Sequence, residues 1–323
     1  MRVVVVGATG NVGTSVLHAL ANEPAVNSVL GVARRLPSLS FPKTEWAAAD
    51  IVSDPLEPLF AGADAVVHLA WLIQPSRRLH VTRAVNVDGS ARVFRAAGKA
   101  GVGALVYASS VGAYSPGPKD RFVDESWPTG GIESSFYSRH KSEVERLLDR
   151  FEAEFPQVRS VRLRPGLIPV VPSVERLRFQ AVHSLDVGEA YRLAVVRDSA
   201  RGAYNVAADP VLDPERLGSL LDARPVGVPA GALRRAADLT WRLRLQPSPV
   251  GWVDMALGVP LMSTARARDE LGWTPRRTAG DALLELLAGM RDRSGADTPP
   301  LRPGAGGPLR LRELLTGLGS TSR

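Results

Sequence analysis

The first thirteen residues, MRVVVVGATGNVG, constrain the fold of this chain more than any other stretch. Val3–Val6 are four consecutive β-branched residues, which is typical of a strand buried on both faces of a parallel sheet. Gly7, Gly10 and Gly13 follow, and a helical pattern continues from about Asn11. Glycines spaced in this way allow a tight turn, close approach of backbone to a pyrophosphate, and close packing of helix on sheet. We therefore expect dinucleotide phosphates at this helix N-terminus, with an ordinary strand-turn-helix as the alternative.

Strands and helices alternate along the chain, which is typical of an α/β protein with a parallel sheet and right-handed crossovers. The pattern predicts strands at 28–33, 46–49, 63–70, 102–109, 158–163 and 203–207, and helices at 83–100, after Tyr137 and at 282–291. We expect a doubly wound parallel sheet (Rossmann) with a smaller mixed α/β C-terminal substrate lobe. The predicted divisions are a dinucleotide-binding domain at 1–165, a substrate lobe at 166–291 whose late strand returns to the sheet, and a flexible Pro/Gly-rich tail at 292–323.

Composition excludes several classes of protein. The chain has no cysteine for disulfides, thiolate zinc sites or nucleophiles, and its five histidines lack the spacing of metal ligands. The net charge of +7 comes from arginines spread along the chain, without a nucleic-acid motif. We expect a small-molecule substrate, and neither nucleic acid nor a membrane as partner. No membrane-length apolar run or signal peptide is evident, which predicts a cytoplasmic protein.

The end of the second predicted strand bears on which dinucleotide binds. Arg34 and Arg35 stand there, where an acid accepts the ribose 2′-hydroxyl of NAD and an arginine accommodates the 2′-phosphate of NADP. Because no acidic residue occurs at this point, NADP(H) is favoured and NAD(H) remains possible. The alternative is a pair of solvated arginines beside a loop.

Two further motifs carry chemistry. Ser109 and Ser110 stand at the carboxyl end of a predicted strand, where open α/β sheets bind ligands. Tyr137 and Lys141 are four residues apart on a helix and share a face. Lowering the pKa of a phenol from about 10 to neutrality costs roughly 4 kcal/mol. An ammonium about 4 Å away supplies energy of that order at an effective dielectric constant of about 20.

These motifs stand together in the order and spacing of one known family. Residues 1–290 resemble the extended short-chain dehydrogenase/reductase family, the NAD(P)-dependent epimerase/dehydratase group, through the glycine motif, Asp50, the strand-end serines, Asn86-Val-Asp-Gly and Tyr137-x-x-x-Lys141. The resemblance implies that Tyr137 is the acid/base and that Lys141 lowers its pKa and holds the nicotinamide ribose. It further implies that Ser110 orients the substrate oxygen and that Asn86 supports the lysine through water. Hydride would move to or from C4 of the nicotinamide.

The resemblance also implies the other contacts of this chain. The expected cofactor-binding residues are Gly7, Thr9, Gly10, Asn11, Val12, Gly13, Arg34, Arg35, Asp50, Ile51, Leu69, Ala70, Tyr137, Lys141 and Pro165. His183 resembles a Val-His-x-x-Asp segment that opens a helix in the smaller lobe, with Asp186 as its acid, and we expect a structural hydrogen bond from it. A homodimer formed through a helical face is a further possible implication.

The same Tyr/Lys pair serves reductions, dehydrogenations, epimerisations and dehydrations in this family, so the neighbouring residues must decide. Val111-Gly112 stand where sugar-nucleotide dehydratases typically have Asp-Glu, and the strand ending at Pro165 lacks the asparagine usual in epimerases. We therefore favour an oxidoreductase that reduces a carbonyl or oxidises an alcohol, with a sugar-nucleotide epimerase as the alternative. The short segment 167–182 adds a third hypothesis, a non-catalytic dinucleotide-binding sensor or partner-binding protein.

Overall fold

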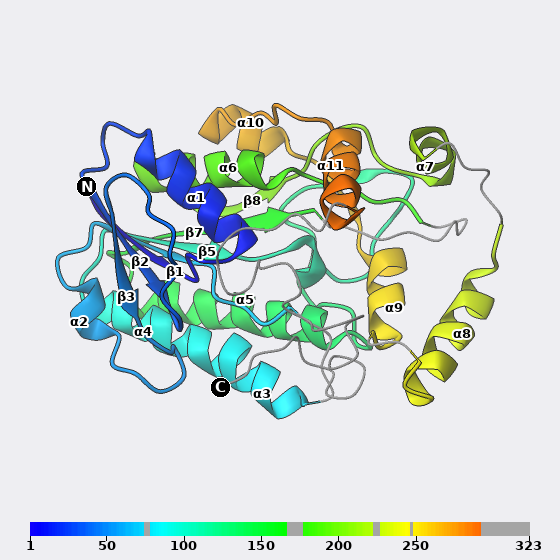
Figure 1. Cartoon of the computed structure of the whole chain (residues 1–323), viewed down its shortest axis with the longest axis horizontal. Helices are drawn as coiled ribbons and strands as arrows, with labels where there is room; N and C mark the ends of the chain where they lie inside the picture. Colours follow the sequence, from blue (N-terminus) through cyan, green and yellow to red (C-terminus); the bar gives the residue numbers. More distant parts are fainter. Residues whose placement is uncertain (74–77, 167–176, 222–226, 246–247, 292–323) are drawn as a thin grey trace.

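The computed structural model describes residues 1–73, 78–166, 177–221, 227–245 and 248–291, and its centre is a seven-stranded parallel sheet (Figure 1). The strands, in spatial order, are β3 (Thr44–Ala48), β2 (Ser28–Ala33), β1 (Arg2–Val6), β4 (Ala65–His68), β5 (Ala104–Ala108), β7 (Arg159–Pro165) and β8 (Gly202–Val206). All six pairings are parallel. The predicted doubly wound sheet is therefore confirmed, including the late strand that returns to it.

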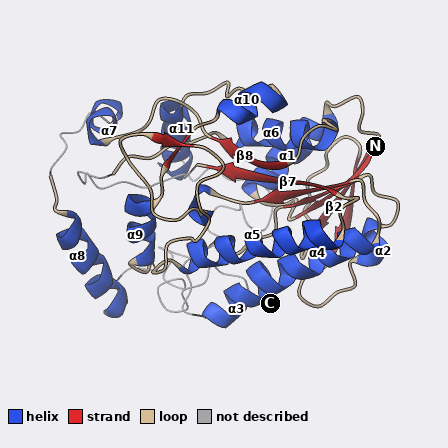
Figure 2. Cartoon of the chain, turned by 180° about the vertical axis from the view of Figure 1, so that it is seen from behind, coloured by secondary structure: helices blue, strands red, loops and turns tan. Residues whose placement is uncertain are grey.

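Helices cover both faces of this sheet, as Figures 1 and 2 show. One face carries α1 (Asn11–Ala21), α6 (Ser184–Val196) and α10 (Ala265–Leu271), and the other carries α2 (Glu57–Phe60), α3 (Leu79–Arg83), α4 (Ser90–Lys99) and α5 (Phe136–Glu154). The four valines of β1 alternate between the two layers, because Val3 and Val5 belong to the core under α1 and α6, and Val4 and Val6 to the core under α4 and α5. The buried strand expected from the valine run is thus covered on both faces.

The long helix predicted over 83–100 is interrupted. The structure has α3, then a π-helical turn η1 (Ala84–Gly89), then α4. One extra residue in a helical turn leaves the apolar periodicity nearly unchanged, so the pattern could not reveal it. The other predicted strands and the C-terminal helix are found with ends shifted by a few residues, and that helix is α11 (Ala279–Arg291).

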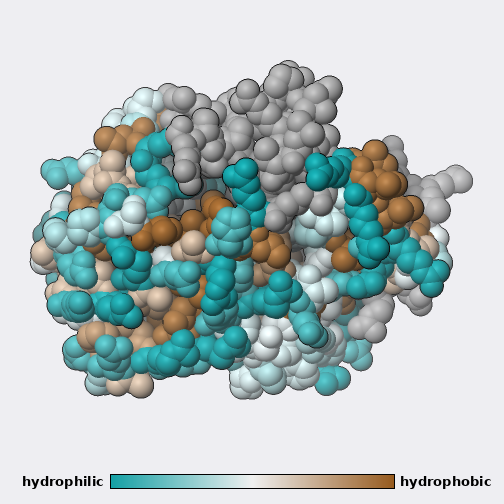
Figure 3. Space-filling model, turned by 90° about the horizontal axis from the view of Figure 1, so that it is seen from below, coloured by the Kyte–Doolittle hydropathy of each residue, from teal (hydrophilic) through white to brown (hydrophobic). Residues whose placement is uncertain are grey.

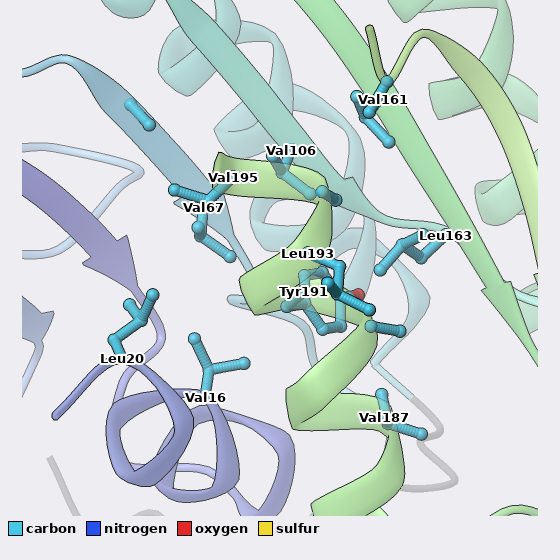
Figure 4. Packing of buried hydrophobic residues seen from close by; sticks show 14 of the residues in the cluster. Val16, Leu20, Val67, Val106, Val161, Leu163, Val187, Tyr191, Leu193 and Val195 are labelled. Atoms are coloured by element: carbon cyan, nitrogen blue, oxygen red, sulfur yellow. The ribbon is translucent and has the colours of Figure 1, made fainter. Parts of the chain in front are cut away.

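Helix α6 lies somewhere other than predicted. It packs beside α1 on the main sheet rather than in the smaller lobe, and Figure 4 shows Val187, Tyr191 and Val195 from α6 in one cluster with Val16 of α1. A Cβ on Gly188 would lie 2.6 Å from the carbonyl oxygen of Ser15, so glycine permits this close approach. The sequence motif identified the start of the helix correctly but carried no information about the surface it covers.

The smaller part of the molecule lies at the end away from β2 and β3 (Figure 1). It contains a two-stranded parallel sheet of β6 (Phe122–Val123) and β9 (Leu261–Met262), with α7 (Pro214–Leu220), α8 (Ala230–Arg242) and α9 (Gly251–Gly258). The predicted tail at 292–323 and residues 167–176 of the short segment lie outside the described residues. Among the helices that are described, none has both the length and the apolar character needed to cross a bilayer.

Candidate active site

The glycine turn follows β1, at the point where the strand order of the sheet reverses. β1 pairs with β2 on one side and with β4 on the other. The strands that follow β1 in the sequence are added first on the β2 side and then, from β4 onward, on the opposite side. Gly7 has φ +86°, and a Cβ there would lie 2.5 Å from the backbone nitrogen of Ala70. A Cβ on Gly13 would lie 2.5 Å from the carbonyl oxygen of Gly7. These two glycines are required by the packing of backbone against backbone.

Gly10 differs from its two neighbours in the motif. A Cβ there would meet only the carbonyl oxygen of Gly7, at 3.6 Å, so the space beside it is open. Helix α1 begins directly after it without a side-chain cap and without an acidic residue in its first turn. Uncapped N–H groups and the positive end of the helix dipole suit a phosphate. The turn, with buried Thr9 and exposed Asn11 beside it, therefore fits the pyrophosphate of a dinucleotide.

The other residues expected at the adenosine end follow the neighbouring strands. Arg34 and Arg35 come directly after β2 and are exposed. Asp50 follows β3, but one of its carboxylate oxygens accepts a hydrogen bond from the Val52 backbone nitrogen at 2.9 Å. The side chain of Ile51 is buried, and a Cβ on Gly89 would lie 2.7 Å from its Cδ1.

The residues expected at the nicotinamide end follow the strands on the other side of β1. The Leu69 backbone nitrogen donates to the Val6 carbonyl oxygen at 2.8 Å, which holds Leu69 and Ala70 beside the glycine turn. Pro165 is the last residue of β7 and pairs with Val206. Since all these strands are parallel, their carboxyl ends lie at one edge of the sheet, where the predicted cofactor residues are brought together.

Ser110 and Tyr137 meet at this same edge. Ser110 follows β5, and its Oγ accepts a hydrogen bond from the Gly112 backbone nitrogen at 3.0 Å. The Ser135 side chain caps the N-terminus of α5 by accepting a hydrogen bond from the Ser138 backbone nitrogen, and Tyr137 lies in the first turn of this helix. The Ser110 hydroxyl lies close enough to the Tyr137 phenol to lower the pKa of that phenol. A Cβ on Gly112 would lie 2.9 Å from Cε1 of Tyr137, so glycine is what lets the phenol lie so close to this loop.

The electrostatics of Tyr137 differ from the expectation. Burial raises the pKa of Tyr137 to about 12, and the nearby Ser110 hydroxyl only partly opposes that rise. Lys141 Nζ lies 5.8 Å from the centroid of the Tyr137 ring, and it donates instead to the Ala108 carbonyl oxygen at 2.6 Å. The predicted lowering of the phenol pKa by Lys141 is therefore wrong for this arrangement, because removal of water from the phenol outweighs a lysine directed elsewhere.

Lys141 is itself in an unusual environment. Its Nζ lies 3.5 Å from the centroid of the Trp71 ring, an arrangement in which the ring face stabilises the ammonium. Burial nevertheless lowers the pKa of Lys141 well below its ordinary value, and the nearby Glu145 carboxylate opposes this shift. Burial thus disfavours the charged form of Lys141, whereas the Trp71 ring and the Glu145 carboxylate favour it.

Asn86 lies in the π-helical turn and is fully buried. Its Oδ1 accepts from the Leu72 backbone nitrogen at 2.7 Å, and its Nδ2 donates to the Leu72 carbonyl oxygen at 3.0 Å. Asn86 thus fixes the backbone next to Trp71, and Trp71 in turn contacts Lys141. Asn86 is thus linked to Lys141 through the backbone of Leu72 and the ring of Trp71, whereas the sequence predicted a link through water.

Two tryptophans that the sequence did not single out enclose Tyr137. The ring centroid of Trp71 lies 5.9 Å and that of Trp252 5.3 Å from that of Tyr137. Both indole nitrogens are buried and have no hydrogen-bond partner. Trp71 and Trp252 lie far apart in the sequence, so no motif spacing links them to the tyrosine.

A buried ionic cluster supports the same loop and helix. Glu145, one turn beyond Lys141 on α5, accepts hydrogen bonds from Arg164 Nε at 2.9 Å and from Arg162 at 3.0 Å, and also from the Ser109 hydroxyl. Burial alone would raise the pKa of Glu145. The two arginines and Ser109 outweigh burial and lower the pKa to about 2. The signal in the sequence was the alternation of arginines with apolar residues in the strand 159–165, which predicts acidic partners on the covering helix.

His183 has the structural role that was expected. Its Nδ1 accepts a hydrogen bond from the Leu185 backbone nitrogen at 3.2 Å and so caps α6. Asp186 receives hydrogen bonds from the Trp273 indole at its carbonyl oxygen and from the Arg277 backbone nitrogen at its carboxylate. Neither residue contacts Tyr137 in any interaction found among the described residues.

The fold and this site define a dinucleotide-binding α/β protein with a serine, tyrosine and lysine at the carboxyl edge of its sheet. The model of the NAD dependent epimerase/dehydratase family matches residues 3–168, and the chain belongs to that family. This match confirms the resemblance found in the sequence. It covers the main sheet from β1 to β7 together with β6, and it ends before β8 and before the other elements of the smaller part.

The proteins similar to this chain include an uncharacterized protein, a sterol carboxylate dehydrogenase and a structure solved with a sugar nucleotide. The chain is 27% identical over 313 residues to the uncharacterized protein Rv2047c of Mycobacterium tuberculosis, which covers 91% of this chain but only 31% of that protein, so the chain spans about a third of its length. It is 26% identical over 161 residues to the decarboxylating sterol-4-alpha-carboxylate 3-dehydrogenase of Saccharomyces cerevisiae, covering 47% of this chain and 46% of that protein. Among solved structures, MoeE5 in complex with UDP-glucuronic acid and NAD has a TM-score of 0.70 at 21% identity, covering 90% of this chain and 99% of that one. At this identity the structural likeness shows the fold alone.

Proposed function

We propose that this chain is an NAD(P)-dependent oxidoreductase that reduces a carbonyl or oxidises an alcohol. The observation that carries the proposal is the proximity of the Ser110 hydroxyl to the Tyr137 phenol, with Lys141 one turn further along the same helix. These groups lie beside a glycine turn that fits a pyrophosphate. The similarity to a protein named as a sterol carboxylate dehydrogenase supports this class of reaction.

Tyr137 carries the proton that reduction of a carbonyl requires. When bound, the nicotinamide supplies the hydride that forms the new C–H bond at the carbonyl carbon. Ser110 holds the carbonyl oxygen, and Tyr137 gives its proton to that oxygen as the C=O π bond breaks, which balances the reduction to an alcohol. With a pKa of about 12, the Tyr137 phenol carries this proton at neutral pH. In this proposal Lys141 would bind the ribose of the cofactor; its Nζ donates to the Ala108 carbonyl oxygen at 2.6 Å and not to the phenol.

The preferred dinucleotide in this proposal is NADP(H). Arg34 and Arg35 are exposed directly after β2, where a guanidinium suits a 2′-phosphate. The dinucleotide in MoeE5 is NAD, so NAD(H) is the competing cofactor. Titration of the purified protein with NADPH and with NADH separates the two, and equal or tighter binding of NADH would refute the role given to the arginines.

The test of the activity is the Tyr137→Phe variant. We expect its turnover with carbonyl substrates to fall by orders of magnitude while NADPH still binds, because only the proton donor is lost. Tyr107→Phe is the matched control, since the Tyr107 hydroxyl is buried without a hydrogen-bond partner and its loss should leave turnover unchanged. Undiminished turnover in Tyr137→Phe would remove the proposed acid.

A sugar-nucleotide epimerase is the second candidate, favoured by the family name and by the UDP-glucuronic acid in MoeE5. An epimerase predicts tightly held cofactor and no net change in NAD(P)H during turnover of a UDP-sugar. A non-catalytic dinucleotide sensor predicts binding of nucleotide without turnover on either class of substrate.

A further inference from the structure

An apolar groove adjoins the candidate active site. We propose that it binds the apolar body of the substrate, so that this chain acts on lipophilic ketones or secondary alcohols. This inference rests on the proposed function, because it names the substrate class of the same site. It commits to a small apolar ligand rather than to a protein or a second copy of the chain.

The groove lies between α8 and α9 and has a volume of about 370 Å³. Its lining is almost entirely apolar or small and includes Leu233, Ala237, Leu245, Trp252 and Val253, with Thr240 and Ser248 as its polar residues. The Thr240 hydroxyl already donates to the Ala236 carbonyl oxygen at 2.7 Å, so it has little need of a ligand. A hydroxylated sugar would lose hydrogen bonds to water here without replacing them.

Charged groups lie at the rim of this groove and not in it. Arg234 of α8 and Asp254 of α9 form a two-point ion pair, with Nε and Oδ1 2.9 Å apart, that joins the two helices. Arg242 pairs with Asp238 within α8, at 2.8 Å. The Arg234–Asp254 pair therefore joins the two walls, and no charged residue is among those that line the groove.

Trp252 connects the groove to the chemistry. The same indole that lines the groove lies 5.3 Å, centroid to centroid, from the Tyr137 ring and 6.3 Å from the Phe136 ring. One aromatic ring therefore separates the groove from the proposed proton donor. In the proposed arrangement the carbonyl lies at Tyr137 and the apolar body of the substrate passes the Trp252 ring to reach the groove.

Helix α8 has apolar surface that the protein itself leaves uncovered. None of the residues of α8 is buried, and Leu245, which follows the helix and lines the groove, is 67% exposed. Figure 3 shows hydrophobic atoms gathered on the right, toward the end of the molecule that carries α8 in Figure 1. A groove wall of this kind gains stability when an apolar ligand covers it.

A homologous series of 2-alkanones, from 2-butanone to 2-decanone, tests the inference with the full chain and NADPH. Each methylene that enters the groove should lower KM about fourfold. Ala237→Phe fills the groove, so it should abolish this dependence of KM on chain length. Ala232→Phe is the matched control, because Ala232 is on the same helix, exposed and outside the groove lining. Leu233→Ala, which removes contacts instead of adding bulk, should weaken 2-decanone binding selectively.

A binding measurement separates this inference from the proposed function. In Tyr137→Phe, quenching of tryptophan fluorescence by 2-decanone should persist, and adding Ala237→Phe should remove it. If no carbonyl is turned over but this binding pattern holds, the groove is correct and the oxidoreductase is wrong. If 2-butanone or a UDP-sugar is turned over while chain length has no effect on KM or binding, the oxidoreductase or epimerase survives and the groove inference is overturned.

Discussion

Replacement of Glu145 by glutamine tests the ionic support beneath the candidate site. The Glu145 side chain is 1% exposed and binds Arg162 and Arg164 on β7. Its pKa is lowered from 4.5 to about 2, which corresponds to about 3 kcal/mol of folding free energy at neutral pH. Because the pKa is lower in the folded state, this contribution is complete above the unfolded pKa and is lost as the pH falls toward 2. At pH 3 roughly half of it remains.

The assay is urea unfolding of the wild type and Glu145→Gln at pH 7 and pH 3, followed by tryptophan fluorescence. We expect the variant to be less stable by about 3 kcal/mol at pH 7, with a gap about half as large at pH 3. Asp149→Asn is the matched control, because Asp149 binds the same Arg162 at 2.7 Å but is 61% exposed, and it should cost less than about 1 kcal/mol. A gap for Glu145→Gln that is the same at both pH values would refute the reasoning.

Three other changes test the site. Gly112→Ala places a Cβ 2.9 Å from Tyr137, so turnover should fall at least tenfold while NADPH affinity is kept; unchanged kinetics would show that the phenol position is not critical. Asn86→Ala leaves the Leu72 backbone polar groups without their partner and should lower the free energy of unfolding by about 1–3 kcal/mol, measured in urea. Arg34→Ser together with Arg35→Ser should weaken NADPH binding more than tenfold and leave NADH nearly unaffected in a calorimetric titration; equal losses would argue for a nonspecific effect of charge.

The main sheet could be predicted because its signals are local. Val3–Val6 are β-branched and lie between the two helical layers, and Gly7 and Gly13 are positions where a Cβ would meet backbone. Such constraints act on residues a few positions apart, so periodicity and spacing record them. The position of Tyr137 relative to Ser110 required the order of motifs along a known family, since their distance in space depends on how α5 packs on β5.

The aromatic and ionic surroundings of Tyr137 could not be predicted in the same way. Trp252 reaches the phenol from α9, and Glu145 reaches Arg164 from a different element, so each contact depends on the tertiary packing of distant segments. The expected lowering of the Tyr137 pKa failed for this reason. A Tyr/Lys spacing establishes that the two side chains share a helix face, but the burial of that face decides which protonation state is stable.

The enclosure of Tyr137 links the direction of the reaction to the class of substrate. Trp71 and Trp252 exclude water from the phenol, and this burial holds the proton that a carbonyl oxygen needs during reduction. The same exclusion of water disfavours a heavily hydroxylated substrate at this point and favours one whose body is apolar. Alcohol oxidation would require the phenolate, whose formation is opposed by burial until the pH approaches 12 or a bound cofactor brings positive charge nearby. Trp252 thus belongs both to the groove and to the surroundings of Tyr137, and it is the residue that joins the two proposals.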